Sequence, residues 1–286
     1  MTYRFASLRA CACLAVAAIF SVATTAHAQY KPRPLNDPAT GESYHIEGSA
    51  ALWFPTADMV VSSESLGIKG SAINFKTDLG LTDQRFTALK LVLRPSKRNK
   101  FRLEFIPIKY ESSGKLTRDI VFNGQKYAAN LPVNSTLDWK AYRLAYEFDF
   151  VSTNRGFFGL VLEAKYTDVG VQLAAPVSVC QNNVCAPLNE FAHAQAPIPA
   201  VGGIGRIYVV PNISITGEMT GVKLPSSAIK NTEAHYFDFD IYGTVNFTNN
   251  FGVQAGYRSL DVGYTLSSDT GSFTLKGPWV GIVARY

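Results

Sequence analysis

The chain ends in the stretch GPWVGIVARY, Gly277 to Tyr286, in which apolar residues alternate with small or polar ones. A period of two is typical of a β-strand with one apolar face. One face of this predicted strand carries Val280, Ile282, Ala284 and Tyr286. The other carries Trp279, Gly281, Val283 and Arg285. Chain ends are usually polar and poorly ordered, so this pattern predicts a C-terminus that belongs to the folded wall of a sheet.

The same period of two recurs along the chain, in segments rich in Tyr, Phe, Val, Thr and Gly. Several of these segments exceed the usual strand length of about five or six residues. We find no convincing amphipathic helix and predict ten strands. Their ranges are Ser43–Phe54, Arg85–Pro95, Phe101–Leu116, Leu137–Phe150, Gly156–Leu173, Phe191–Val209, Ile213–Leu224, His235–Phe247, Phe251–Leu266 and Gly271–Tyr286.

The connections between the predicted strands alternate in length. SKRN, VSTN, VPN and TNN are tight turns, whereas most of the other connections are longer and polar. Short turns on one side, longer loops on the other and an even strand number are typical of transmembrane barrels of the bacterial outer membrane. The predicted fold is therefore all-β, a closed antiparallel up-and-down transmembrane β-barrel of ten strands. Eight or twelve strands remain open, because the partly apolar stretch Thr56–Asp83 can hold an extra hairpin.

The two faces of the predicted strands differ in chemistry. In LDWKAYRLAYEFDF, Tyr142 and Leu144 share a face, and Arg143 and Glu147 lie on the other. Apolar faces would contact lipid and polar faces would line the lumen, where a lone buried charge costs several kcal/mol and charges must pair. Lipid tolerates no unpaired sheet edge, so the first and last strands should meet. The predicted lumen charge network is Glu47, Lys90, Arg102, Glu104, Arg143, Glu147, Glu163, Lys165, Arg206, Glu218, Asp240 and Arg258.

The N-terminus has the pattern of a cleaved secretory signal peptide, residues 1–28. Arg4 and Arg9 precede the apolar run Ala10–Val22, which is too short for a comfortable membrane anchor, and the small-x-small motif AHA follows. Residues 29–41 would be a short periplasmic segment and residues 42–286 the barrel domain. Loss of the two arginines lowers the formal net charge from +5 to +3, since residues 1–28 carry no acidic residue. That charge is too weak to suggest binding to nucleic acid.

The mature chain would keep two cysteines, Cys180 and Cys185, in the segment VCQNNVC. Two lone cysteines this close together in an exported protein predict a local disulfide. No His or carboxylate lies between them, so we expect no metal site there. The sequence also lacks a phosphate-binding loop with Lys, an H-E-x-x-H helix and a G-x-S-x-G motif, and we expect no cofactor.

A C-terminal strand of alternating apolar residues ending in an aromatic resembles the sorting signature of bacterial outer-membrane β-barrel proteins. The aromatic-glycine segment FGVQAGYRSLDVGY fits the same broad family. The resemblance implies insertion into the Gram-negative outer membrane, contact with its lipid, and recognition of Val280, Ile282, Ala284 and Tyr286 by the barrel-assembly machinery. It implies no particular activity and no oligomeric state.

Three functions are compatible with this sequence. The first is a non-enzymatic membrane scaffold or a surface-loop protein for adhesion or envelope integrity. The second is a narrow channel or small-solute transporter, with Arg143, Arg206 and Arg258 as selectivity residues. The third is a hydrolase that uses His235 with Asp238 or Asp240, although the flanking residues match no hydrolase motif. We favour the first, without catalytic residues, because mid-strand charges of both signs predict a plugged lumen and ten strands lie near the closed end of barrel sizes.

Overall fold

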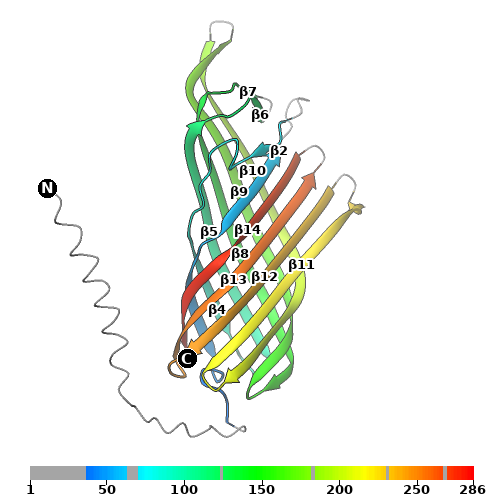
Figure 1. Ribbon diagram of the computed structural model, residues 1–286. Coiled ribbons are helices and arrows are strands. Elements are labelled where there is room, and N and C mark those ends of the chain that lie inside the picture. The colour runs from blue at the N-terminus through cyan, green and yellow to red at the C-terminus, as the bar shows by residue number, and fades with distance from the viewer. Residues whose placement is uncertain (1–36, 63–69, 123–124, 182–183, 230–231, 267–268) are drawn as a thin grey trace, which may run out of the picture. The chain divides into compact units, whose positions relative to one another are not determined.

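The computed structural model describes residues 37–62, 70–122, 125–181, 184–229, 232–266 and 269–286 (Figure 1). Among these residues, no helix is long and apolar enough to span a membrane. The strands are β1 (Ile46–Trp53), β2 (Thr56–Ser62), β3 (Ile73–Asn74), β4 (Phe86–Leu93), β5 (Asn99–Lys115), β6 (Ile120–Phe122), β7 (Gln125–Tyr127), β8 (Pro132–Thr153), β9 (Gly156–Gln181), β10 (Val184–Val210), β11 (Ile213–Ile229), β12 (Thr232–Asn246), β13 (Phe251–Leu266) and β14 (Asp269–Arg285).

Ten of these strands form a closed antiparallel barrel, which confirms the predicted fold. Their order around the wall is β1-β4-β5-β8-β9-β10-β11-β12-β13-β14, and β1 pairs with β14 to close it. The closing ladder runs from Glu47 opposite Arg285 to Trp53 opposite Trp279. The backbone N–H of Tyr286 also donates to the carbonyl of Ile46 at 2.8 Å. The C-terminal segment is therefore one side of the seam that closes the wall.

The first predicted strand continues past its expected end at Phe54. β1 pairs with the C-terminal half of β14, and β2 pairs with residues 270–276 of the same strand. β3 adds the short hairpin that the sequence left open. The ladder breaks at Pro55, which has no N–H to donate. Across the break lies Gly277, where a Cβ atom would stand 2.2 Å from the carbonyl oxygen of Phe54.

Prolines inside the long strands lie where pairing on one side has stopped. The pairing of β4 with β5 ends at Phe105, and Pro107 follows it. The pairing of β10 with β11 ends at Val201, and Pro197 and Pro199 lie beyond that point. Because proline lacks a backbone N–H, it is tolerated beside an open edge and not in the middle of a complete ladder. The β10–β11 seam therefore separates two sheets at the end of the barrel that carries the longer loops.

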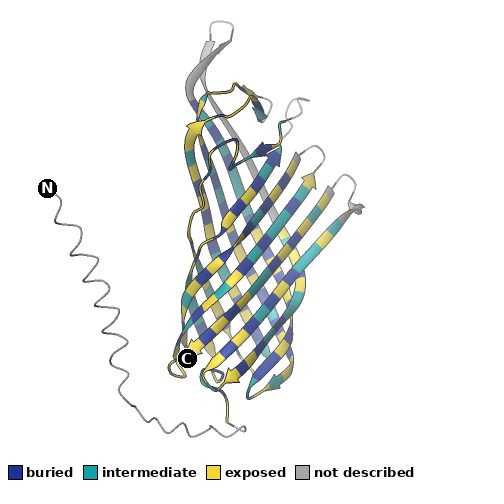
Figure 2. Ribbon diagram, in the orientation of Figure 1, coloured by how far each residue is buried: buried dark blue, intermediate teal, exposed yellow. Residues whose placement is uncertain are grey.

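A belt of exposed apolar side chains surrounds the barrel at the end with the short turns. Buried and exposed residues alternate along the strands in Figure 2, and Leu144, Leu162 and Ile282 are among the exposed apolar residues of the belt. Val280, Ala284 and Tyr286 share the outward face of Ile282. Such a band matches the hydrocarbon layer of a membrane. Beyond it the outward side chains are polar, so the wall extends past the belt as a water-exposed section, here called the outer end.

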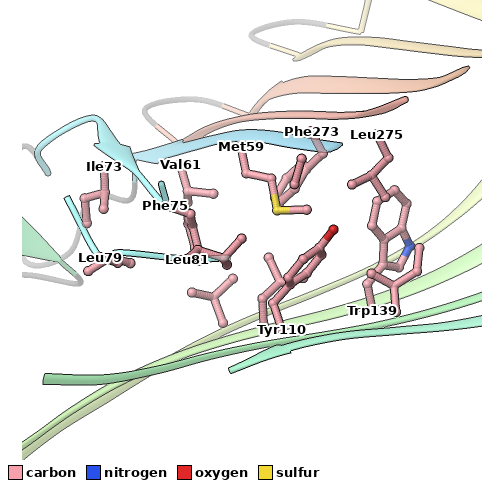
Figure 3. Close-up of a cluster of buried hydrophobic side chains, with 14 of the residues drawn as sticks. Met59, Val61, Ile73, Phe75, Leu79, Leu81, Tyr110, Trp139, Phe273 and Leu275 are labelled. Carbon is pink, nitrogen blue, oxygen red and sulfur yellow. The ribbon is translucent and has the colours of Figure 1, made fainter. Parts of the chain in front are cut away.

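The outer end has an apolar interior, which Figure 3 shows in part. Residues 70–85, the described part of the segment between β2 and β4, fill the space between the two sheets. Its buried side chains meet apolar residues of β2, β5, β8 and β14 in a single cluster. The labelled members in Figure 3 are Met59, Val61, Ile73, Phe75, Leu79, Leu81, Tyr110, Trp139, Phe273 and Leu275.

Polar contacts hold this segment in place. The Nε and Nη2 atoms of Arg118 donate to the two carboxylate oxygens of Asp78, at 3.1 and 2.8 Å. The hydroxyl of Ser112 on β5 donates to the carbonyl of Leu79 at 2.7 Å. Burial tends to raise the pKa of Asp78, but the hydrogen bonds from Arg118 and from the Asn74 backbone outweigh it and lower the pKa below its ordinary value.

The close approach at Gly277 gives a test of closure. Gly277→Ala should lower the free energy of unfolding by about 1–3 kcal/mol, because the new methyl group meets the Phe54 carbonyl. Gly48→Ala is the matched control, since a Cβ atom there would have no neighbour within 4 Å. Urea unfolding in detergent measures both. Equal free energies of unfolding for the two variants would contradict the close approach of Gly277 to the Phe54 carbonyl.

The Asp78–Arg118 contact gives a pH dependence at the outer end. A lowered carboxyl pKa stabilises the fold at every pH above the unfolded value of about 3.9, and this stabilisation is lost as the pH falls through the folded value. Hydrogen-exchange protection of residues 76–81 should therefore fall below about pH 4 in the native chain. Asp78→Asn should start with lower protection and change less with pH. An unchanged pH profile in this variant would show that another group controls the segment.

Candidate functional site

The lumen inside the apolar belt holds one large network of charged side chains. In the described part of the chain it contains nine basic and nine acidic residues, so its formal charge is zero. The basic members are Lys90, Arg94, Lys100, Arg102, Arg143, Lys165, Arg206, Arg258 and Arg285. The acidic members are Glu42, Glu47, Glu104, Glu147, Asp149, Glu163, Glu218, Asp238 and Asp240.

Arg143 on β8 is the centre of this network. Its Nη1 atom lies 3.2 Å from Oε2 of Glu104, and its Nε atom lies 2.6 Å from Oε2 of Glu163. Its Nη2 atom bonds to Glu218, which also accepts from Arg102 at 2.5 Å. The planar guanidinium group presents donors in a fixed fork, so one side chain can hold carboxylates from three different strands.

A second group of contacts surrounds Arg258 on β13. Its Nη1 atom lies 2.6 Å from Oε1 of Glu104, and its Nη2 atom lies 2.6 Å from Oδ2 of Asp238. The hydroxyl of Tyr236 donates to Asp238 at 2.9 Å and accepts from Nζ of Lys165. These residues mark the level where the charged lumen meets the apolar interior of the outer end.

The end of the barrel with the short turns is filled by the segment before β1. The backbone N–H of Ala39 donates to Asn154, and that of Thr40 donates to Pro211, at 2.9 and 2.7 Å. Glu42 lies 3.4 Å from Arg94, which continues the charge pairing into this segment. Residues 39–41, part of the predicted segment 29–41, thus contact the turns at this end of the barrel. Glu42, which follows these residues, supplies the carboxylate partner of Arg94 at the barrel mouth.

The structure places all twelve predicted network residues inside the barrel. Eleven of them form ion pairs, and Asp240 accepts a hydrogen bond from Nε1 of Trp279 at 2.8 Å. The predicted network omitted six members, four on strands (Lys100, Asp149, Asp238 and Arg285) and two outside them (Glu42 and Arg94). Each of the four strand residues lies two positions from a predicted lumen residue on its own strand, or opposite one across a ladder, so the same alternation could have found them.

The predicted disulfide lies at the tip of the longest hairpin. The register of β9 and β10 sets Cys180 opposite Cys185. Their side chains lie outside the described residues, so the disulfide stays a prediction.

The pairing of His235 with Asp238 or Asp240 is wrong. His235 is half-exposed on the outward face of β12, and its Nε2 atom lies 3.8 Å from Oδ1 of Asp261. Asp238 and Asp240 face the lumen, because residues an odd number of positions apart in a strand lie on opposite faces. In the described part of the chain, no three His, Cys, Asp or Glu side chains converge as a metal site requires.

Removal of the central arginine gives a direct test of the network. Arg143→Met should lower the free energy of unfolding by about 3–5 kcal/mol, because Glu104, Glu163 and Glu218 lose a shared buried partner. Lys109→Met is the control, since it removes an exposed ion pair with Glu111 and should cause no measurable change. Urea unfolding in detergent compares the two. A small effect at Arg143 would mean that the remaining cations re-pair with its carboxylates.

No protein-family model and no curated protein matches the chain. Among solved structures, the outer membrane protease OmpT of Escherichia coli is similar, with a TM-score of 0.51 and 8% identity, covering 84% of this chain and 96% of that one. The toluene transporter TodX of Pseudomonas putida has a TM-score of 0.39 and 10% identity, and the match covers 87% of this chain and 92% of that one. Ail, the attachment invasion locus protein of Yersinia pestis, has a TM-score of 0.31 and 9% identity. The match covers 83% of this chain and 99% of that one. With its closed ten-stranded wall and this likeness to OmpT, the chain has the fold of the Gram-negative outer-membrane β-barrel proteins.

Proposed function

We propose that this protein is a non-enzymatic, non-conducting outer-membrane barrel that anchors a rigid recognition platform at the cell surface. The observation that carries the proposal is the filled lumen. Paired charges occupy it inside the belt, apolar side chains occupy it in the outer end, and residues 39–44 occupy its mouth at the short turns.

The charge network supports a closed lumen on energetic grounds. An ion that crossed the belt would have to separate pairs such as Arg143–Glu218 and Arg102–Glu147, and each exposed partner would cost several kcal/mol. The cavity beside Asp240 and Trp279 measures about 30 Å³, which is room for very few water molecules. Barrels of this size are generally filled by side chains, and open aqueous pores occur at larger strand numbers.

The acidic residues of the lumen support a structural role. A general base needs an available oxygen within reach of its substrate. Glu218 is shared by Arg143 and Arg102, and Asp238 is shared by Arg258, Lys165 and Tyr236. Carboxylates held in this way stabilise the barrel and are poor candidates for catalysis of an external reaction.

The packing of the outer end is consistent with the proposed rigid platform. Its two sheets enclose their own apolar cluster and extend beyond the lipid belt on the side of the longer loops. This section needs no contact with lipid for its stability, so it can hold loops and outward side chains in fixed positions. For its biogenesis we propose export by the signal peptide of residues 1–28 and insertion by the barrel-assembly machinery through β14. The purified barrel can stand alone as a monomer.

Planar-bilayer conductance tests the closed lumen. The refolded chain, checked by gel heat-modifiability, should give no steady unitary openings at high salt. The positive control combines Arg143→Ser and Glu218→Ser with deletion of residues 39–44 and 72–82, which removes charges from the belt, the segment in the mouth and the segment that fills the outer end. This variant should conduct if it folds. Steady openings from the native chain would overturn the proposal and favour a narrow channel.

A further inference from the structure

The outward face of the outer end carries a pocket of about 290 Å³, next to the lipid belt. Four strands form it, and one register row crosses its floor: His235 on β12, Gly263 on β13, Ser272 on β14 and Val60 on β2. Because Gly263 has no side chain, the row has a gap at its centre. The pocket is therefore a shallow depression in the wall, in which a neighbouring side chain can lie over the glycine.

The gap at Gly263 is occupied from one side by the imidazole of His235. A Cβ atom at Gly263 would stand 2.2 Å from Cε1 of this ring and less than 3 Å from both ring nitrogens. Asp261 lies beneath the ring, with Oδ1 at 3.8 Å from Nε2, and accepts a hydrogen bond from the hydroxyl of Thr274 at 3.0 Å. The glycine, the carboxylate and the hydroxyl together hold the imidazole over Gly263, as part of the pocket floor.

The rest of the rim is mainly polar. The row above the floor consists of Glu233, Thr265 and Thr270, all exposed. The row below begins with Phe237, whose ring is exposed on the same face, and continues with Asp261. The pocket lining thus combines the carboxylate of Glu233, hydroxyls that both donate and accept, and the imidazole of His235, while Phe237 and Asp261 lie in the register row beside the pocket.

This chemistry excludes several ligand classes. The carboxylates of Glu233 and Asp261 would repel an inorganic anion, and the described residues offer no three-ligand metal site. The polar rim gives a purely apolar molecule little to contact. A neutral molecule with many hydroxyl groups satisfies the donors and acceptors together, and one of its apolar faces can lie on Phe237. We propose that this pocket binds a saccharide.

The position of the pocket limits where this saccharide comes from. Phe237 belongs to the exposed apolar belt on β12, and His235 is the next outward residue beyond it. A bound sugar would therefore lie at the boundary between the bilayer and the surrounding water. It could belong to a glycolipid of the outer leaflet or to a glycan of another surface, and both present the same hydroxyl chemistry. The inference rests on the proposed platform function and gives it a ligand class.

A glycan array tests the proposal with the full chain in phospholipid nanodiscs. Native protein should be retained on neutral oligosaccharides. Gly263→Val, which expels the imidazole, and His235→Ala should each lower retention roughly tenfold, as expected for the loss of hydrogen bonds to the ligand. Thr136→Val, an outward substitution on β8 away from the pocket, should leave retention unchanged. Gel heat-modifiability shows that each variant is folded, and His235→Ala serves if Gly263→Val does not fold.

A second arm separates the two sources. Nanodiscs that contain lipopolysaccharide should protect His235 from acylation by diethylpyrocarbonate if a glycolipid occupies the pocket, with His45 as the internal reference. Protection by free oligosaccharide alone would assign the pocket to a glycan of a partner. Absence of retention and protection in both arms, or retention that neither variant lowers, would overturn the proposal. Conductance is measured separately from glycan binding. A protein that neither conducts nor binds glycan would therefore overturn the saccharide proposal and remain consistent with the closed lumen.

Discussion

The pairing of every backbone polar group within the lipid is the constraint from which the rest of this structure follows. Hydrocarbon offers no partner to an unpaired N–H or C=O group, so the wall must close, and β1 meets β14 along a ladder that reaches the last residues. Closure places one face of every strand in lipid and the other in a narrow interior. The polar face then has charges that only other protein groups can neutralise, and equal numbers of both signs satisfy this requirement.

The interior changes character where the surroundings of the wall change. Inside the belt the outward face is apolar and the lumen is charged, whereas beyond the belt the outward face is polar and the interior is apolar. The outer end therefore resembles a soluble two-layer sheet built on top of a membrane barrel. Lys165, Tyr236 and Asp238 lie where the two regimes meet, which accounts for their position between ion pairs and packed aromatic rings.

The sequence was sufficient wherever a period of two continued without interruption. Ten strands, their closure and the inward position of twelve charges follow from this period and from the alternation of turn lengths. The segment between β2 and β4 could not be placed, because its apolar residues Ile73 and Phe75 have no regular period and gain their burial only from strands distant in sequence. The contact of His235 with Asp261 depends on the register between β12 and β13, which no local pattern specifies. The pocket at Gly263 depends on the same register.

The unpaired edge of β10 beyond Val201 matters in a membrane that is densely packed with other proteins. An uncovered strand edge is a template on which another chain can add a strand, and dense packing of proteins favours such contacts. Pro197 and Pro199 remove two donors from this edge, close to where β11 diverges from it. A neighbouring copy therefore meets an interrupted ladder. The prolines that allow the two sheets to separate also protect the protein from edge-to-edge aggregation.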